Sequence, residues 1–123
     1  MMTTLVFGAS TKPGRYSGIA IKRLVDAKKS VVAYGIRPGE IHGIQIKTNL
    51  DDFQNIHTIT LYVNPKIQAL YYDKIIQLRP NRVIFNPGTE NPEFYPLLRK
   101  YDIVPVQACT LVLLATHQYD ETH

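Results

Sequence analysis

The sequence contains little cysteine and no long apolar run. Among its 123 residues Cys109 is the only cysteine, which excludes a disulfide within the chain and fits a reducing cytoplasm. The longest apolar stretch, 111–115, is far shorter than the roughly 20 residues that a membrane-spanning helix needs. The first residues carry no basic segment ahead of an apolar one, so we expect neither a signal peptide nor an anchor. The sequence therefore predicts a cytoplasmic protein with no membrane role.

A continuous basic stripe is also lacking, although the formal net charge is +4. The lysines and arginines are scattered along the chain instead of being gathered in runs with interleaved aromatic residues. Such clustering is what an electrostatic nucleic-acid surface requires. We therefore expect no nucleic-acid partner.

Residue patterns typical of catalysis are missing too. The four histidines have spacings that do not suit a shared metal ion, and neither H-x-x-x-H nor C-x-x-C occurs. The pairs Asp51, Asp52 and Asp73, Asp102 do not form an acid and base pair at helical or strand-end spacing. Cys109 lies among apolar neighbours, an environment typical of an unreactive thiol. We predict a protein that is not an enzyme and has no metal site.

Short apolar runs alternate with longer segments of helical periodicity. Five runs rich in β-branched and aromatic residues lie at 3–8, 30–36, 58–63, 82–86 and 102–107. Their nearly continuous apolar character is typical of strands that are covered on both faces. Helices are predicted over 17–29, 66–80 and 91–101, the last with Asn91 as N-cap and Pro92 in its first turn.

Two further segments complete the pattern. Residues 38–53 are predicted to be a connection between the second and third strands, with a short turn or helix near 51–53. The apolar residues 111–115 are predicted to belong to the core, and a homodimer through their exposed part stays open.

The alternation of strands and helices defines the fold class. It implies right-handed crossovers and a parallel sheet. We predict an α/β protein with a parallel sheet of about five strands and helices on both faces, as one domain over residues 1–123. Such a sheet binds its ligands beyond the carboxyl ends of the strands, where the strand order reverses.

The first of these strand ends is the sequence VFGASTKPGRYSG, residues 6–18. Gly8 permits a tight turn, and the small residues Ala9 and Ser10 let the backbone approach a ligand closely. The helix that follows presents unpaired amides and the positive end of its dipole, which together favour a phosphate group.

Polar side chains of the same loop strengthen that interpretation. Lys12 and Arg15 add positive charge, and Ser17 would cap the helix or donate a hydrogen bond to a phosphate oxygen. The spacing matches neither G-x-G-x-x-G nor the P-loop ending G-K-[ST], so a nucleoside triphosphatase is rejected. A plain turn whose glycines only relieve backbone strain stays an alternative at this point.

The end of the second strand carries a cation. NAD-binding folds place an acidic residue there to hold the ribose hydroxyls, whereas this chain has Arg37. A cation attracts a phosphate group on the ribose of adenosine, as in NADP and coenzyme A. Plain NAD is disfavoured, with the nearby Glu40 keeping it as a minor alternative.

Five motifs in register resemble a known family. They are VFGAS with R-Y-S after the first strand, GIRPGEIHG after the second, YVNP after the third, FNPGTENPE after the fourth and VQAC after the fifth. Together they resemble the small bacterial CoA-binding-domain proteins with a Rossmann-like fold, and the N-terminal CoA-binding domain of the succinyl-CoA synthetase alpha subunit. The resemblance extends from about residue 4 to residue 117.

The resemblance implies a Rossmann-like, doubly wound sheet and non-catalytic binding of coenzyme A or an acyl-CoA. The diphosphate would lie on the first loop and the helix N-terminus. Matched by position, the implied contacts are Gly8, Ala9, Ser10, Lys12, Arg15 and Ser17 for the phosphates, Ile36, Arg37, Pro38, Val63, Asn64 and Pro65 for the adenosine, and Asn86, Pro87 and Gly88 for the pantetheine arm.

Two other functions stay open on the residues alone. An NADP-dependent oxidoreductase would use the same loop and the same cation, although the chain lacks a Tyr-x-x-x-Lys pair and a substrate domain. An interaction domain whose ligand site has decayed would keep the fold without the ligand.

Overall fold

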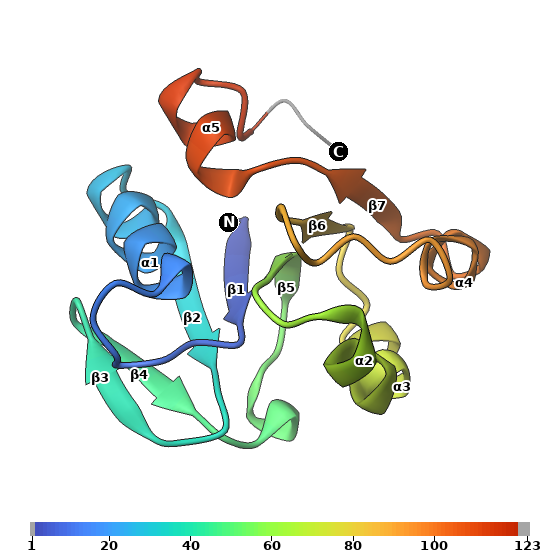
Figure 1. Cartoon of the computed structure of the whole chain (residues 1–123), viewed down its shortest axis with the longest axis horizontal. Helices are drawn as coiled ribbons and strands as arrows, with labels where there is room; N and C mark the ends of the chain where they lie inside the picture. Colours follow the sequence, from blue (N-terminus) through green and yellow to red (C-terminus); the bar gives the residue numbers. More distant parts are fainter. Residues whose placement is uncertain (1, 121–123) are drawn as a thin grey trace.

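A twisted β-sheet runs through the centre of the protein (Figure 1). The structure is a computed structural model, and it describes residues 2–120. Across these residues seven strands form one sheet in the order β3-β4-β2-β1-β5-β6-β7. Their bounds are β1 Thr3–Phe7, β2 Ser30–Tyr34, β3 Gly39–Ile41, β4 Ile44–Lys47, β5 Ile56–Leu61, β6 Arg82–Phe85 and β7 Val104–Gln107.

The strand pairing confirms the Rossmann-like α/β class. β1 pairs in parallel with β2 on one side and with β5 on the other, and β5, β6 and β7 continue in parallel. The chain therefore extends the sheet from β1 first in one direction and later in the opposite one. The strand order reverses between β1 and β5, which places the switch point at the ends of these two strands.

The number of strands is seven and not five, because the connection 38–53 contains a β-hairpin. β3 pairs antiparallel with β4, and β4 pairs in parallel with β2. The hairpin turns at His42 and Gly43, which have φ values of 51° and 80°. Positive φ at both central residues is typical of a two-residue turn that matches the twist of the strands. The short helix predicted near 51–53 is confirmed as the 3₁₀ helix η1, Leu50–Asp52.

Helices cover both faces of the sheet, as predicted. The helices α1 (Tyr16–Asp26) and α5 (Thr110–Ala115) pack on one face, where Ile21, Leu24 and Leu113 join a buried cluster with Val6. The other face carries α2 (Pro65–Gln68), the 3₁₀ helix η2 (Ala69–Tyr71), α3 (Tyr72–Gln77) and α4 (Tyr95–Lys100). Neighbouring residues of β1 point to opposite faces, so the strand is buried on both sides.

The helix predicted over 66–80 is interrupted. Tyr71, the last residue of η2 and the N-cap of α3, leaves the helical conformation, with φ −123° and ψ 8°. Its ring packs against Phe7 and Tyr34, with centroid distances of 5.3 and 5.9 Å. Packing of this ring on the sheet accompanies the break, which the helical periodicity alone does not reveal.

Two predicted helix caps are wrong. Arg15, not Ser17, is the N-cap of α1, and Ser17 lies inside the first turn. α4 begins at Tyr95 with Phe94 as its N-cap, because the side chain of Asn91 is engaged with Gln68 and Tyr72 instead. The segment 111–115, predicted as core, forms most of α5, in which Leu113 is buried and Val112 is exposed.

The C-terminal segment returns to the core beside a buried cation. Arg82 is fully buried, and it donates hydrogen bonds from Nε to Thr58 Oγ1 and from Nη1 to the carbonyl of Tyr119, both 2.8 Å long. Its guanidinium lies 4.5 Å from the centroid of the Tyr119 ring. The Tyr119 hydroxyl in turn bonds to Thr4. The contacts attach the end of the described chain to β1, β5 and β6.

Candidate functional site

The loops that follow the parallel strands gather at one edge of the sheet. We call this the carboxyl edge, formed by the segments after β1, β2, β5, β6 and β7. All the residues implied as ligand contacts lie in these segments or in the first turn of α1. The structure therefore brings together, at the switch point, stretches that are far apart in the sequence.

The start of the first loop is fastened to the neighbouring strand. Gly8 has a φ of +98°, which favours glycine, and an added Cβ would lie 2.8 Å from Val63 Cγ1. The amides of Gly8 and Ala9 both donate to the carbonyl oxygen of Tyr34, at 2.9 and 2.8 Å. These two amides are thus occupied by β2, so Gly8 and Ala9 shape the loop while their N–H groups face the protein.

The later part of the loop is open. Lys12 and Arg15 are exposed, and the Lys12 amide donates to Ser10 Oγ at 3.1 Å. The first-turn amides of Tyr16 and Ser17 lack a helical carbonyl four residues earlier. The first turn of α1 holds no acidic residue that would neutralise the positive end of the helix. This part of the site offers cations and backbone donors to an anion.

The loop after β2 packs tightly on the first loop. A Cβ at Gly35 would lie only 2.3 Å from the carbonyl oxygen of Ala9, so the two backbones are in direct contact. Beyond this contact Ile36, Arg37 and Pro38 are exposed, and Ile36 is 82% accessible. The predicted adenosine contacts on this side are therefore available to a ligand.

The hairpin supports the first loop from outside. A Cβ at Gly39 in β3 would lie 2.7 Å from Thr11 Cγ2, and one at Gly18 in α1 would lie 2.8 Å from Ile41 Cδ1. β3 thus contacts both the first loop and the start of α1. Sequence reasoning missed this contribution because it treated 38–53 as a connection, although His42 and Gly43 between alternating isoleucines are a hairpin signal.

The loop after β5 begins α2. Asn64 caps this helix, with its Oδ1 accepting a hydrogen bond of 2.9 Å from the Ile67 amide, and Pro65 is the first helical residue. Val63 is half-buried against Gly8. Of the three predicted contacts in this loop, Asn64 is exposed but has its side-chain oxygen occupied by the cap.

The loop after β6 starts with a buried amide. Asn86 is 3% exposed, and its Nδ2 donates to Thr60 Oγ1 at 2.7 Å and to the Leu61 carbonyl at 2.9 Å. Its Oδ1 accepts from the Thr110 amide at 2.9 Å. Asn86 therefore joins β5, β6 and the start of α5, whereas the next residues, Pro87 and Gly88, are exposed.

Tyr62 lies beside this amide cluster. Its hydroxyl donates to Asn86 Oδ1 at a distance of 3.5 Å. Burial raises the pKa of Tyr62 to about 12, partly opposed by hydrogen bonds to the hydroxyls of Thr60 and Thr110. Tyr62 is therefore neutral at physiological pH and acts as a packing and hydrogen-bonding group.

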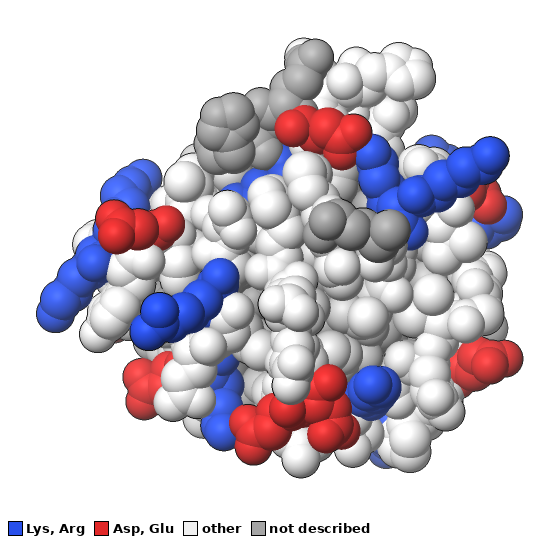
Figure 2. All heavy atoms as spheres, turned by 180° about the vertical axis from the view of Figure 1, so that it is seen from behind, with Lys and Arg blue, Asp and Glu red and all other residues white. Residues whose placement is uncertain are grey.

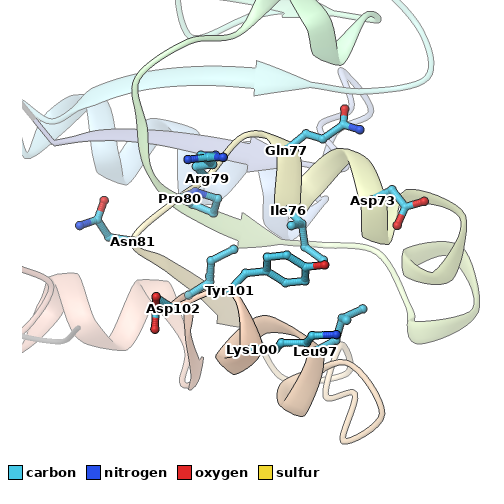
Figure 3. Close-up of a pocket in the computed structure, with 11 residues that line it drawn as sticks. Asp73, Ile76, Gln77, Arg79, Pro80, Asn81, Leu97, Lys100, Tyr101 and Asp102 are labelled. Atoms are coloured by element: carbon cyan, nitrogen blue, oxygen red, sulfur yellow. The ribbon is translucent and has the colours of Figure 1, made fainter.

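A hollow of about 870 Å³ lies elsewhere, between α3 and α4 (Figure 3). Its lining includes Gln77, Asn81, Lys100 and Ile103, which stand at the ends of these helices and just before β6 and β7. It is therefore at the edge opposite the carboxyl edge. Helix C-termini present carbonyl groups and a negative dipole end, which disfavour a phosphate group, so we place the candidate site at the carboxyl edge.

The surface charge is mixed where it is seen from behind. Figure 2 shows Lys and Arg side chains distributed among Asp and Glu, without a continuous basic stripe on this face. Within residues 2–120 three or more His, Cys, Asp or Glu side chains do not gather as a metal site would require. In the same range every helix is too short or too polar to cross a bilayer.

The strand order and the helices on both faces define an α/β protein with a Rossmann-like fold. The chain belongs to the family described as "CoA binding domain", whose model matches residues 2–115. Among curated proteins, none matches the sequence.

Solved structures share this fold. The chain is similar to a crystal structure described as an uncharacterized protein, with 39% identity, a TM-score of 0.92, and coverage of 96% of this chain and 98% of that one. A Thermus thermophilus protein, cell-free ID.343, shares 21% identity at a TM-score of 0.84, over 95% of this chain and 90% of its own. A hypothetical protein from Pyrococcus horikoshii OT3 shares 24% identity at a TM-score of 0.77, over 89% and 80%. The last two similarities show the fold.

Proposed function

We propose that this protein binds coenzyme A or an acyl-CoA at the carboxyl edge and does not itself catalyse a reaction. The observation that carries the proposal is the family match over residues 2–115, which includes every segment of that edge. The geometry of the edge supports it at three points.

The first point is the diphosphate. The first-turn amides of Tyr16 and Ser17, which have no helical carbonyl four residues earlier, lie at the start of α1, and the exposed Lys12 and Arg15 are in the loop that leads to it. Two adjacent phosphates carry charges that this combination stabilises through hydrogen bonds and the helix dipole. Gly8 and Ala9 contribute by holding the loop in shape, since their amides bond to Tyr34.

The second point is the ribose phosphate of the adenosine. Arg37 is exposed directly after the backbone contact between Gly35 and Ala9, which fixes the two loops against each other. A guanidinium in this place pairs with a phosphate on the ribose, and such charge-assisted bonds are among the stronger ones in proteins. This preference separates coenzyme A from ligands whose ribose carries only hydroxyls.

The third point is that the carboxyl edge is long enough to hold an extended ligand. Val63 to Pro65 and Pro87 to Gly88 follow neighbouring strands on the far side of the switch point. A ligand whose diphosphate lies at α1 can therefore place its adenosine between the loops after β2 and β5 and extend its pantetheine arm along the loop after β6. That no reaction is catalysed, and that the site works in the cytoplasm, are proposals that rest on the sequence patterns described first.

Thermal unfolding with added ligands tests the function. We expect millimolar coenzyme A to raise the Tm by several degrees, because a ligand at about 100 times its Kd adds roughly 2.7 kcal/mol to the free energy of unfolding. Dephospho-CoA, which lacks the ribose phosphate, is expected to raise the Tm less. Curves that do not move with either ligand would contradict the proposal, and a larger shift with NADP would favour a nicotinamide dinucleotide instead.

A further inference from the structure

A chain of hydrogen-bonded polar side chains, most of them buried, connects the loops after β5 and β6 with the end of β7. Gln68 at the end of α2 is fully buried, and its Nε2 donates to the carbonyls of Val63 and Thr89, both at 2.8 Å. Its Oε1 accepts a hydrogen bond of 2.9 Å from Asn91 Nδ2. Gln68 thus uses both ends of its amide to join the loop after β5 to the loop after β6.

The chain of bonds continues to the last parallel strand. Asn91 is 3% exposed and donates from Nδ2 to the hydroxyl of Tyr72 at 2.8 Å, and from its backbone amide to the hydroxyl of Tyr95 at 3.1 Å. The Tyr95 hydroxyl also accepts from Gln107 Nε2 at 2.7 Å, at the end of β7. Buried polar groups that are hydrogen-bonded to one another in this way hold one arrangement, because each lost partner leaves a costly unpaired group.

The two loops depend on Gln68 to different degrees. The loop after β5 has other supports, since the Tyr62 amide bonds to the Phe7 carbonyl and Asn64 caps α2. In the loop after β6 the further bonds of Thr89 are local, because its amide and its hydroxyl both donate to the Asn86 carbonyl. Gly88 is similarly held by a neighbour, the carboxylate of Glu90 at 2.7 Å.

We infer that Gln68 is a positioning residue that fixes the loop after β6 against α2. In this proposal Gln68 does not contact the ligand, because its side-chain amide is hydrogen-bonded to Val63, Thr89 and Asn91. This inference rests on the proposed function, in which the loop after β6 holds the pantetheine arm. Gln68 therefore sets the affinity for that arm and not for the adenosine phosphates. Preorganised loops bind more tightly because less ordering is needed on binding.

The test compares coenzyme A with adenosine 3′,5′-bisphosphate, which lacks the pantetheine arm. Gln68→Met keeps the shape of the side chain and removes its hydrogen bonds. We expect this variant to raise the Kd for coenzyme A at least fivefold while the Kd for the bisphosphate stays within twofold. Parallel weakening of both ligands, or no change in either, would overturn the inference.

Two further variants separate positioning from stability. Ile75 lies in α3, is fully buried in the same layer, and has no polar side-chain atom that could take part in these hydrogen bonds. Ile75→Val should therefore lower the Tm without changing the ratio of the two Kd values. Tyr72→Phe removes only one acceptor of Asn91 and serves as a milder variant if Gln68→Met does not fold. It should change the ratio in the same direction by about twofold, and an unchanged ratio in a folded Tyr72→Phe protein would overturn the inference.

Hydrogen exchange measured without ligand tests the positioning role of Gln68 independently of the proposed function. In Gln68→Met the amides of Gly88 and Thr89 should exchange at least tenfold faster, while amides of β1 and β5 keep their relative protection. Unchanged exchange at Gly88 and Thr89 overturns the positioning role even if coenzyme A binds. Faster exchange together with a wild-type protein that binds neither ligand supports the positioning of the loop and refutes the coenzyme A proposal.

Discussion

At the scale of single residues, the carboxyl edge separates groups that build the site from groups that a ligand can reach. The amides of Gly8 and Ala9 are bonded to Tyr34, and the side chain of Asn86 is bonded within the protein. Arg37, by contrast, is exposed. Residue type predicted which loops form the candidate site but not this division, because each hydrogen-bond partner comes from another strand.

The role of Arg37 can be tested directly. We expect Arg37→Ala to raise the Kd for coenzyme A about five- to thirtyfold, equivalent to a loss of about 1 to 2 kcal/mol for a charge-assisted contact. The Kd for dephospho-CoA should not change, since that ligand lacks the ribose phosphate. Isothermal titration calorimetry measures both.

The matched control for this variant is Arg99→Ala. Arg99 is an exposed arginine in the last turn of α4, away from the carboxyl edge. Its replacement by alanine changes the net charge by the same amount as Arg37→Ala does. If Arg99→Ala weakened coenzyme A as much as Arg37→Ala does, the effect would be one of overall charge, and the assignment of Arg37 to the ribose phosphate would be wrong.

Tyr62 gives a prediction about alkaline pH. Its pKa is raised from 10.0 to about 12 in the folded protein, so the unfolded chain releases this proton first. The stability that the neutral phenol contributes is present below pH 10 and is lost as the pH rises toward 12, by up to roughly 2 to 3 kcal/mol.

Urea unfolding at pH 9 and pH 11 measures this contribution. The free energy of unfolding should fall more steeply in the wild-type protein than in Tyr62→Phe, which has no phenol to titrate at this position. Equal slopes in the two proteins would show that burial of Tyr62 does not shift its titration.

At the scale of elements, the sequence predicted those helices and strands that a local residue pattern indicates. All five predicted runs are strands. β1, β5 and β6 are covered on both faces, so nearly every residue of these strands is buried, including the threonines of β5. The hairpin of β3 and β4 was missed since its strands are short and alternate with polar residues. The break at Tyr71 could not be predicted, as the packing of its ring on Phe7 and Tyr34 is a tertiary contact.

The contact between the ends of β1 and β2 supplies a prediction at this scale. In Gly35→Ala the new Cβ would lie 2.3 Å from the Ala9 carbonyl oxygen, so one backbone must move. We expect a loss of about 1 to 3 kcal/mol, seen as a Tm several degrees lower in thermal unfolding.

Gly18→Ala is the comparison. Its Cβ would meet only the end of the Ile41 side chain at 2.8 Å, which can rotate, and alanine favours the helix by about 0.5 to 1 kcal/mol. We expect little change in Tm. A Gly35→Ala protein as stable as Gly18→Ala would refute the tight backbone contact.

At the scale of the whole molecule, the sheet places its two edges in different electrostatic surroundings. The start of α1, with the positive end of its dipole, lies at the carboxyl edge, whereas the ends of α3 and α4, with their carbonyl groups, lie at the hollow between these helices. The Rossmann-like order β2-β1-β5 then brings Arg37, the first loop and the loop after β5 together. The thermal shifts proposed for coenzyme A and dephospho-CoA test this arrangement as a unit.

The contact of Gly35 with Ala9 also affects how variation among relatives should be interpreted. Position 35 is confined to glycine by backbone packing, so a glycine that persists there through evolution says nothing about which ligand a relative binds. Arg37, two residues later and exposed, has no such structural constraint. Relatives that keep both residues are candidates for the same ligand. Relatives that keep the glycine but lose the arginine share the fold of these loops, and their ligand specificity is free to differ.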